Sequence, residues 1–549
     1  MPEKPNIITI ESIFGGQSEF RYFGSKDQFQ TSYAIDPDLP SSDSNPQIYG
    51  PSGFLRPVSS QRIDFSFAGT PMWMVPNPKD ENVYVLDATG SLYTLDPDDY
   101  TITALSDGGT LSSGSGNGLA YHKNYIYIFK NTDVARYGPL NGTPEFNGSY
   151  WVGSPLSTTA LVNTTYPSLV RATKALPNHP AHFHSSDGRL YFGDVVGNQG
   201  TIHYIDTTKT TVEGDTNESS KYNALDLPHG YWPTDIESYG TDLAIALYEG
   251  SNDAGTIQRR AKLSFWDTTA TNFNKIIDVE FPDPIITALE NVNGVLWTFS
   301  GQLGVLGTRV CKFVGGYSFE QVAFISDSEP PFPGATTALL NKVLFAGTVA
   351  SVKDTLGPPC VWAYGSKTGK FNGLFNVMGA TASGTTSDIT SLGVVSQLGG
   401  LGVATVGLQV PIIGWNTGTG APFGIDRQTD AYGGVNPIWR SQTYRIGRPF
   451  KITKIRIPLA NNIADSSRTI VPKIFIDEAR SSYTLTTINS TNYPNDDAGG
   501  AVIAAPKNIV IKPDAVVGQH NFFLELTWSG TGLLTVGLPI TIEYEILND

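Results

Sequence analysis

Short apolar stretches separated by turn residues recur along most of the chain, from about residue 65 to about residue 425. The stretches are short and rich in Val, Ile, Leu, Tyr and Phe, which is typical of β-strands. Gly, Asn and Asp, the residues that tight turns favour, separate one stretch from the next. No segment shows a convincing amphipathic helical period. The pattern therefore predicts an all-β protein.

These strands group into a loose repeating unit: a strand, a tight turn, a second strand and often a third. In the first unit the strands cover Val83–Asp87 and Ser91–Asp96, and in the last they cover Ile389–Val395, Leu401–Thr405 and Ile412–Trp415. A period of about 50 residues is that of one four-stranded propeller blade. We therefore predict a β-propeller of about seven blades. A string of β-sandwiches, the competing interpretation, would have a period of about 100 residues.

The two ends of the chain differ from this repeat. Pro, Ser, Gly and Asp interrupt the apolar runs of residues 1–60, above all from Asp36 to Pro51, which predicts an extended N-terminal arm with short strands. Such an arm lies either across a neighbouring subunit or around its own domain. The Gly- and Thr-rich segment Asn416–Gly424 predicts a linker. Beyond it, runs such as Lys451–Leu459 alternate strictly, which predicts a C-terminal β-sandwich or jelly roll. The expected domains are therefore the arm (1–60), the propeller (61–428) and the sandwich (429–549).

Composition narrows the classes of function. The formal net charge is −15, and an acidic surface repels phosphate, so we expect no sequence-specific binding of nucleic acid. No apolar run approaches the roughly 18 residues of a membrane-spanning helix. The segment Met1–Pro5 lacks the apolar region of a secretory signal. Only Cys311 and Cys360 are present, which is typical of folding in a reducing cytosol.

The densest group of candidate ligands is the histidine-rich segment from residue 178 to residue 188. If residues 181–184 form a strand, His182 and His184 share a face, and together with His179 or Asp187 they could bind a metal. No HExxH motif or fixed carboxylate spacing supports that interpretation. Histidines at a strand end more often hydrogen-bond the backbone. We therefore expect no metal and no cofactor, with His182, His184 and His179 as weak candidates only.

A catalytic site is equally weakly indicated. A propeller glycosidase needs two or three carboxylates that meet at the axis. The candidates for that role are Asp87, Asp194, Asp235 and Glu290. A chain with 51 acidic residues is expected to offer such groups by chance. No nucleophile elbow, P-loop or dinucleotide fingerprint lies in a strand–turn–helix context. The chain is therefore predicted not to be an enzyme.

Several aromatic residues could instead stack on sugar rings, namely Tyr150–Trp151, Tyr231–Trp232 and Trp439. Aromatic packing between blades is the favoured interpretation of the same residues. A carbohydrate-binding or receptor-binding propeller is therefore an alternative function, and a propeller glycosidase a less favoured one.

The whole organisation resembles the propeller-containing tail proteins of tailed bacteriophages. The stretch Pro437–Pro458 (PIWRSQTYRIGRPFKITKIRIP) is similar to the opening of domains that follow propellers in such virion proteins, and Gly15–Lys26 has the same character. The resemblance is architectural, and no residue role is carried over from the family. It implies a non-enzymatic structural protein of the virion tail, made in the host cytoplasm and placed in a ring, nozzle or tip. The implied partners are copies of itself in a symmetric ring and other tail proteins (adaptor, tail tube or fibre), with a host-surface glycan as a further possibility.

Overall fold

The computed structural model confirms an all-β chain with a β-propeller. The structure describes residues 5–18, 27–37, 54–105, 111, 118–130, 133–148, 179–196, 199–206, 219–249, 260–269, 277–302, 306–313, 317–331, 333–350, 356–366, 373–382, 387–397, 408–417, 422–429, 435–460, 468–477, 482–493, 507–514, 516–530 and 534–547. The one helical element in these residues is a 3-10 turn, η2 (Pro333–Ala335). No helix in the described part of the chain is long and apolar enough to cross a membrane.

Seven four-stranded antiparallel sheets form the propeller and are numbered here as blades in chain order. Blade 1 contains β7 (Pro71–Pro76), β8 (Val83–Asp87), β9 (Leu92–Leu95) and β10 (Ile102–Ala104); blade 2 contains β11 (Leu119–His122), β12 (Tyr125–Phe129), β13 (Val134–Gly138) and β14 (Glu145–Asn147); blade 3 contains β15 (Ala181–His184), β16 (Arg189–Val196), β17 (Gln199–Asp206) and β18 (Ser219–His229). Blade 4 contains β19 (Tyr231–Tyr239), β20 (Asp242–Glu249), β21 (Lys262–Trp266) and β22 (Ile277–Glu280); blade 5 contains β23 (Ile285–Val292), β24 (Val295–Gly301), β25 (Thr308–Phe313) and β26 (Phe319–Ile325). Blade 6 contains β27 (Thr336–Leu339), β28 (Lys342–Ala350), β29 (Leu356–Tyr364) and β30 (Leu374–Gly379); blade 7 contains β31 (Asp388–Gln397), β32 (Leu408–Asn416), β33 (Phe423–Thr429) and β6 (Ser59–Arg62).

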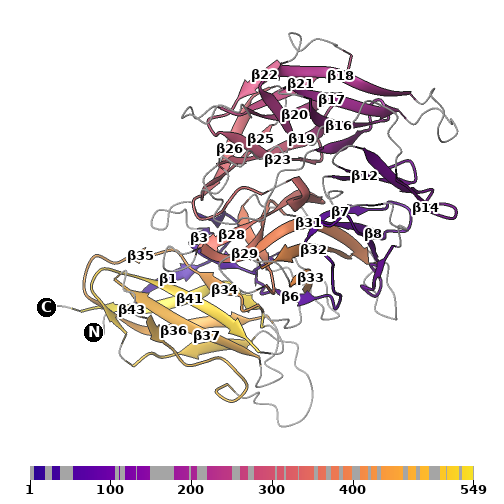
Figure 1. Cartoon of the computed structure of the whole chain (residues 1–549). Coiled ribbons are helices and arrows are strands. Elements are labelled where there is room, and N and C mark those ends of the chain that lie inside the picture. Colours follow the sequence, from indigo (N-terminus) through magenta and orange to yellow (C-terminus); the bar gives the residue numbers. More distant parts are fainter. Residues whose placement is uncertain are drawn as a thin grey trace. The chain divides into compact units, whose positions relative to one another are not determined.

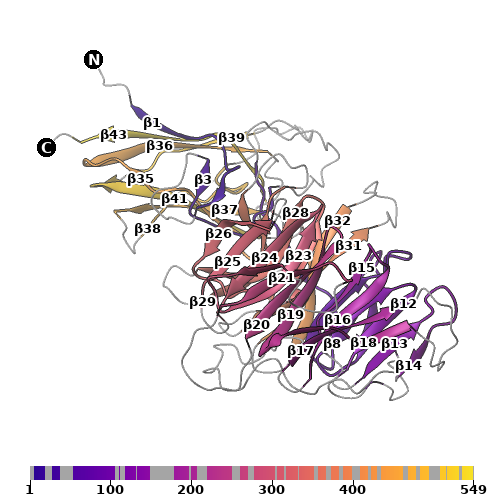
Figure 2. The ribbon, with the colours of Figure 1, turned by 90° about the horizontal axis from the view of Figure 1, so that it is seen from above.

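The first strands of the blades form a closed circle. Each of these inner strands contacts the next one, in the order β7, β11, β15, β19, β23, β27 and β31, and β31 contacts β7 again. Figures 1 and 2 show the blades following one another from indigo to orange. Aromatic side chains on the second strands fill the space between blades, as for Phe129 and Phe192 (5.1 Å between ring centroids) and Phe299 and Phe345 (4.7 Å). Stacking blades in this way buries both faces of each sheet.

The circle closes with a strand from the beginning of the chain. β6 is the fourth strand of blade 7, although its residues precede blade 1 in sequence. Just beyond β6, the amide of Ile63 donates to the carbonyl of Ile425 (2.9 Å), and the Arg62 guanidinium donates to the carbonyl of Phe423 (3.2 Å). The ends of the propeller are therefore joined by backbone pairing as well as by packing.

Part of the predicted linker is in fact a strand. Residues 423–429 form β33, the third strand of blade 7, where the sequence indicated a connection. The strand was missed because its polar residues hide the alternation, and because Gly424 was interpreted as a loop residue. Gly424 is required here by space, since a Cβ at this position would lie 2.4 Å from the Trp415 ring. The strand predicted at Leu401–Thr405 lies outside the described residues.

The C-terminal part of the chain forms two further sheets. The seven-stranded sheet contains β1 (Asn6–Ile10), β43 (Ile540–Ile546), β36 (Phe450–Leu459), β42 (Val536–Gly537), β5 (Phe54–Leu55), β39 (Lys507–Ile511) and β40 (Val517–Gly518). The six-stranded sheet contains β38 (Ser482–Thr484), β37 (Thr469–Ile476), β41 (Asn521–Ser529), β34 (Ile438–Arg440), β4 (Thr31–Tyr33) and β35 (Tyr444–Arg445). The burial of β36 and β37 alternates residue by residue, and the rings of Phe450 and Phe522 meet across the two sheets at 5.5 Å.

Strands from the first 60 residues are part of these sheets. β1 pairs with β43 at the far end of the sequence, β4 pairs with β34, and β5 pairs with β42. A short parallel pair, β2 (Gly16–Gln17) and β3 (Gln28–Phe29), lies between β1 and β4 in sequence. The described parts of the predicted arm are therefore strands that pair within their own chain; most of the stretch from Asp36 to Pro51 lies outside the described residues.

By their internal contacts the residues separate into two compact units. One comprises Met1–Gln61, Cys360–Thr381 and Gln428–Asp549, and the other comprises Arg62–Pro359 and Ala382–Arg427. The N-terminal segment thus belongs with the C-terminal sheets.

Candidate functional site

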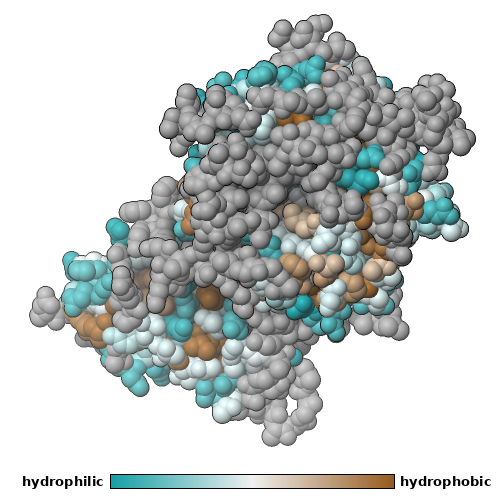
Figure 3. All heavy atoms as spheres, viewed as in Figure 1, coloured by the Kyte–Doolittle hydropathy of each residue, from teal (hydrophilic) through white to brown (hydrophobic). Residues whose placement is uncertain are grey.

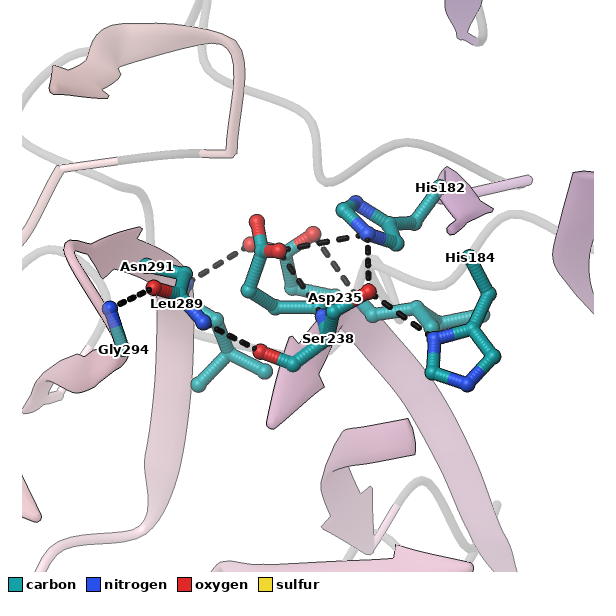
Figure 4. Close-up of polar contacts among 9 residues, drawn as sticks. His182, His184, Asp235, Ser238, Leu289, Asn291 and Gly294 are labelled. Carbon is teal, nitrogen blue, oxygen red and sulfur yellow. Dashed lines mark hydrogen bonds and ion pairs between the residues drawn. The ribbon is translucent and has the colours of Figure 1, made fainter. Parts of the chain in front are cut away.

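The histidine-rich segment forms β15, the inner strand of blade 3, and two of its histidines contact blade 4. His182 and His184 share one face of the strand, as their spacing predicts. The nitrogen Nε2 of His182 lies 2.8 Å from Ser238 Oγ, and Nδ1 of His184 lies 2.9 Å from the same oxygen. Figure 4 shows Ser238 between the two imidazole rings. The two histidines thus tie β15 to β19.

The partners of these groups define where the protons lie. Nε2 of His184 faces the carbonyl oxygen of Thr241 at 3.1 Å, and a carbonyl only accepts, so Nε2 carries the hydrogen. Nδ1 of His184 is then left to accept the Ser238 hydroxyl. The Ser238 oxygen then accepts from Nε2 of His182. Burial, and next the charge of His184, lower the pKa of His182 to about 3, so His182 donates as a neutral imidazole.

His179 lies in a different cluster. Its Nδ1 is 3.1 Å from the carbonyl of Gly193 and 3.5 Å from the carboxylate of Asp194. The other oxygen of Asp194 is 3.4 Å from Nε2 of His203, and all three side chains are at most 1% exposed. Asp194, a candidate for an axial catalytic acid, is therefore a buried acceptor between two histidines. In the described residues, no three His, Cys, Asp or Glu side chains are grouped so as to hold a metal ion.

Three carboxyl groups meet on the inner strands of blades 4 and 5. Asp235 and Glu237 belong to β19, and Glu290 belongs to β23. Asp235 accepts the amides of Ile236 (2.9 Å) and Leu289 (2.7 Å), so it bridges the two strands. Glu237 Oε1 accepts the amide of Ser238 (2.8 Å) and lies 3.2 Å from His182 Nε2. We call His182, His184, Asp235, Glu237, Ser238 and Glu290 the inner-strand cluster.

The acidity of the three carboxyl groups differs from that of exposed side chains. Burial, and only then the nearby charge of Glu237, raise the pKa of Asp235 well above its usual value, although two amides oppose the shift. Burial raises the pKa of Glu237 to about 7. Burial, followed by the charges of Glu237 and Asp235, raises the pKa of Glu290 well above its usual value, against hydrogen bonds from Thr336 and Ala338. The group therefore carries fewer than three charges at neutral pH.

Side chains of the inner strands repeatedly bond to the adjacent blade. The hydroxyl of Thr234 donates to the carbonyl of Ile286 (2.6 Å), which joins blade 4 to blade 5. The hydroxyl of Thr390 donates to the carbonyl of Pro71 (2.6 Å), which joins blade 7 to blade 1. The side-chain amide of Asn291 donates to the backbone carbonyl of Ser238 (2.7 Å), and this bond is also visible in Figure 4. The chemistry of this region is thus mainly that of connections between blades.

The remaining predicted candidates are separated from the inner-strand cluster. Asp87 is buried at the turn between β8 and β9, where it accepts the amides of Thr89 and Ser91 (both 2.9 Å) and the hydroxyl of Tyr93 (3.0 Å). Of the four acids considered for glycoside hydrolysis, Asp235 and Glu290 belong to the inner-strand cluster, and the charge of Asp235 acts on Glu290.

The aromatic candidates for sugar binding are mostly enclosed. Trp232 and Trp439 are buried, and Tyr231 is half-buried under the ammonium of Lys262, 4.9 Å from the ring centroid. Tyr150–Trp151 lies outside the described residues. Both tryptophans thus lie inside the protein, but only Trp232 belongs to a blade, since Trp439 lies on β34 of the six-stranded sheet.

Sequence reasoning missed Glu237 and Ser238, which complete the cluster. They follow Asp235 in β19, and no motif marks them. The signal that could have found them is the unusual density of polar residues in an inner strand, Thr234-Asp-Ile-Glu-Ser. A buried strand of this kind needs polar partners on its neighbours.

Replacing Ser238 with alanine is expected to destabilise the chain by about 1–3 kcal/mol, because Nδ1 of buried His184 loses its donor and His182 Nε2 loses an acceptor. Urea unfolding of the purified variant measures this loss. The exposed Ser186, in the turn after β15, supplies the matched control Ser186→Ala, for which no change is expected. Equal stability of the two variants would contradict the bonding scheme.

Comparisons with known proteins concern the propeller. No family model matches the sequence, and no curated protein matches it either. The WD40 domain of Neurospora crassa Pan2 is similar with 9% identity and a TM-score of 0.37, over 66% of this chain and 89% of that one. The N-terminal domain of Nup159 gives 11% identity and a TM-score of 0.37 over 68% and 94% of the two chains. The SapL1 lectin in complex with alpha methyl fucoside gives 9% identity and a TM-score of 0.33, over 55% of this chain and 94% of that one. The assignment of the propeller rests on the seven sheets themselves.

Proposed function

We propose that this chain is a non-enzymatic structural protein of a bacteriophage tail, made in the host cytoplasm and assembled into a ring, nozzle or tip. The resemblance of Pro437–Pro458 to domains that follow propellers in tail proteins motivates the proposal. The observation that carries it is the direction of the polar side chains on the inner strands. His182, Asp235 and Thr234 bond to the neighbouring blade, an arrangement that favours a stiff support over an open reaction site.

Contacts with other subunits are proposed to use the edge of the seven-stranded sheet. β1 is the edge strand of this sheet in the described part of the chain, and Ile7 on it is 58% exposed. On the face shown in Figure 3, apolar residues form several small groups among polar ones instead of one large patch. A sheet edge offers free backbone donors and acceptors to a strand of another subunit. A copy of this chain, or another tail protein, would bind by strand addition.

Negative-stain images of the purified chain, alone and with the proteins encoded beside it, test this proposal. Closed rings of copies, or rings formed on a tail partner, are expected. Ile7→Lys should weaken the assembly while the melting temperature stays unchanged, because lysine at a sheet edge opposes strand addition. Leu340→Lys is the matched control, since Leu340 is 53% exposed at a hairpin of the propeller.

The proposal would be overturned by a chain that stays monomeric with every tail partner and neighbours no tail or capsid genes. Clear binding on a glycan array, together with a failure to assemble, would favour the alternative of a carbohydrate-binding or receptor-binding propeller. Hydrolysis of a sugar polymer that is lost in Glu290→Gln would establish the third alternative, a glycosidase.

A further inference from the structure

The inner-strand cluster places titratable groups of three consecutive blades against one another. His182 comes from blade 3, Asp235 and Glu237 from blade 4, and Glu290 from blade 5. Between His182 Nε2 and Glu237 Oε1 the distance is 3.2 Å, and their side chains are 22% and 16% exposed. Asp235 reaches the backbone of β23, and Glu290 interacts with Thr336 and Ala338 of β27. Each of these contacts joins two blades.

Hydrogen-bond directions define the state in which these contacts are best satisfied. Glu237 Oε1 already accepts from the Ser238 amide and shares with Ser238 Oγ the one hydrogen on His182 Nε2. A proton on Glu237 therefore belongs on its other oxygen, Oε2, where it leaves both bonds intact. Loss of that proton adds a negative charge that acts on both Asp235 and Glu290. Like charges at short range disfavour each other strongly where water is scarce.

The surroundings offer little compensation for such a charge. The adjacent inner strand β27 (TTAL) and the second strand β24 (VLWTFSG) contain no titratable side chain. On β16 and β17 the titratable groups are otherwise engaged, since Arg189 pairs with Asp187 and Asp206, and Asp194 with His179 and His203. On β20 the acids Asp242 and Glu249 lie at the two ends of the strand. The shifts in the pKa values of the three carboxyl groups come from burial, from one another's charges and from hydrogen bonds.

We propose that His182, Asp235, Glu237 and Glu290 form a proton-dependent clamp between blades 3, 4 and 5, which holds while Glu237 keeps its proton and weakens when that proton is lost. The clamp makes the stiffness of the propeller depend on pH. It acts near neutrality, since burial raises the pKa of Glu237 from 4.5 to about 7.

Whether stability rises or falls with pH depends on how many protons the open and the closed propeller bind. Where blades 3 to 5 are open, Glu237 is expected to titrate near 4.5, whereas in the closed propeller it keeps its proton until about pH 7. The contribution of Glu237 to stability is therefore full below about pH 4.5 and is lost as the pH rises through 7. Asp235 and Glu290 have the same sign, since their pKa values are also raised. His182 opposes them, because its pKa is lowered from 6.5 to about 3.

Hydrogen exchange of the full chain between pH 5 and pH 8, corrected for the intrinsic exchange rate, tests the clamp. Protection of amides in β15 and β19 is expected to fall with rising pH relative to β8 in blade 1. This net fall is expected because the pKa values of three carboxyl groups are raised, whereas only that of His182 is lowered. Glu237→Gln removes one titrating proton, so the ratio of protection in wild type to that in the variant should change by up to about tenfold per pH unit below pH 7 and then level off. Glu280→Gln is the matched control, since Glu280 is 61% exposed on β22.

Two results of this experiment would contradict the clamp. If protection of β15 and β19 in the wild type follows β8 at every pH, blades 3 to 5 do not respond to protons. If Glu237→Gln keeps the wild-type pH dependence, Glu237 is not the group that titrates. The wild-type measurement alone decides the matter if Glu237→Gln does not fold.

Discussion

A chain that lacks residues 1–62 is expected to lose cooperative folding. The deletion removes β6 from blade 7, β1 and β5 from the seven-stranded sheet, and β4 from the six-stranded sheet. Blade 7 then loses the pairing of β6 with β33 and exposes the edge of β33. β43 in turn loses its partner β1 along five residue pairs. Thermal unfolding followed by circular dichroism should show a broad, shallow change in place of a sharp transition.

Deletion of residues 1–4, which precede β1, is the control for this experiment and should unfold as the full chain does. A sharp transition at the wild-type temperature in the longer deletion would contradict the role assigned to the N-terminal strands. An intermediate result, with one of two transitions lost, would show that one of the two units folds without them.

Replacement of Trp439 by alanine is expected to cost about 3–5 kcal/mol, the range for deleting a large buried aromatic side chain. Trp439 lies on β34 with no exposed surface, and its ring centroid is 6.4 Å from that of Phe29. The indole nitrogen is buried and has no hydrogen-bond partner in the described residues. Trp439→Phe should therefore cost much less, because it leaves a smaller cavity and removes an unsatisfied donor. Denaturant unfolding of both variants measures the difference.

Tyr483→Ala serves as the comparison for these variants, since Tyr483 is 44% exposed on the edge strand β38 and should change stability little. Equal losses for the alanine and phenylalanine replacements at Trp439 would contradict the expected effect of cavity size.

The blades could be predicted from sequence because their central strands carry the apolar residues. β8 and β24, for example, are almost entirely buried, and their mostly apolar sequences stand out between turns. Outer strands give a weaker signal, since β22 (IDVE) has a mostly exposed burial pattern. β6 (SSQR) contains no apolar residue at all, so nothing in its own sequence indicates that it completes a blade. Its place depends on pairing with a strand more than 300 residues away.

The candidate site could be predicted only in part, for a similar reason. The spacing of His182 and His184 places both on one face of a strand, and the structure agrees. Their shared partner Ser238 comes from the next blade, more than 50 residues later. His179, three residues from His182, turns instead to Asp194. Which histidines meet depends on how the blades pack, and spacing along one segment does not contain that information.

The closing strand has a consequence for synthesis of the protein. A ribosome completes β6 early, but its partner β33 begins only at Phe423. At about 5–20 residues per second, some 360 residues of chain take roughly 20–70 s to make. During this time β6 waits without its partner, and β1 waits still longer for β43. A nascent chain therefore carries unpaired strand edges for most of its synthesis, which makes it a natural substrate for chaperones that bind near the ribosome exit.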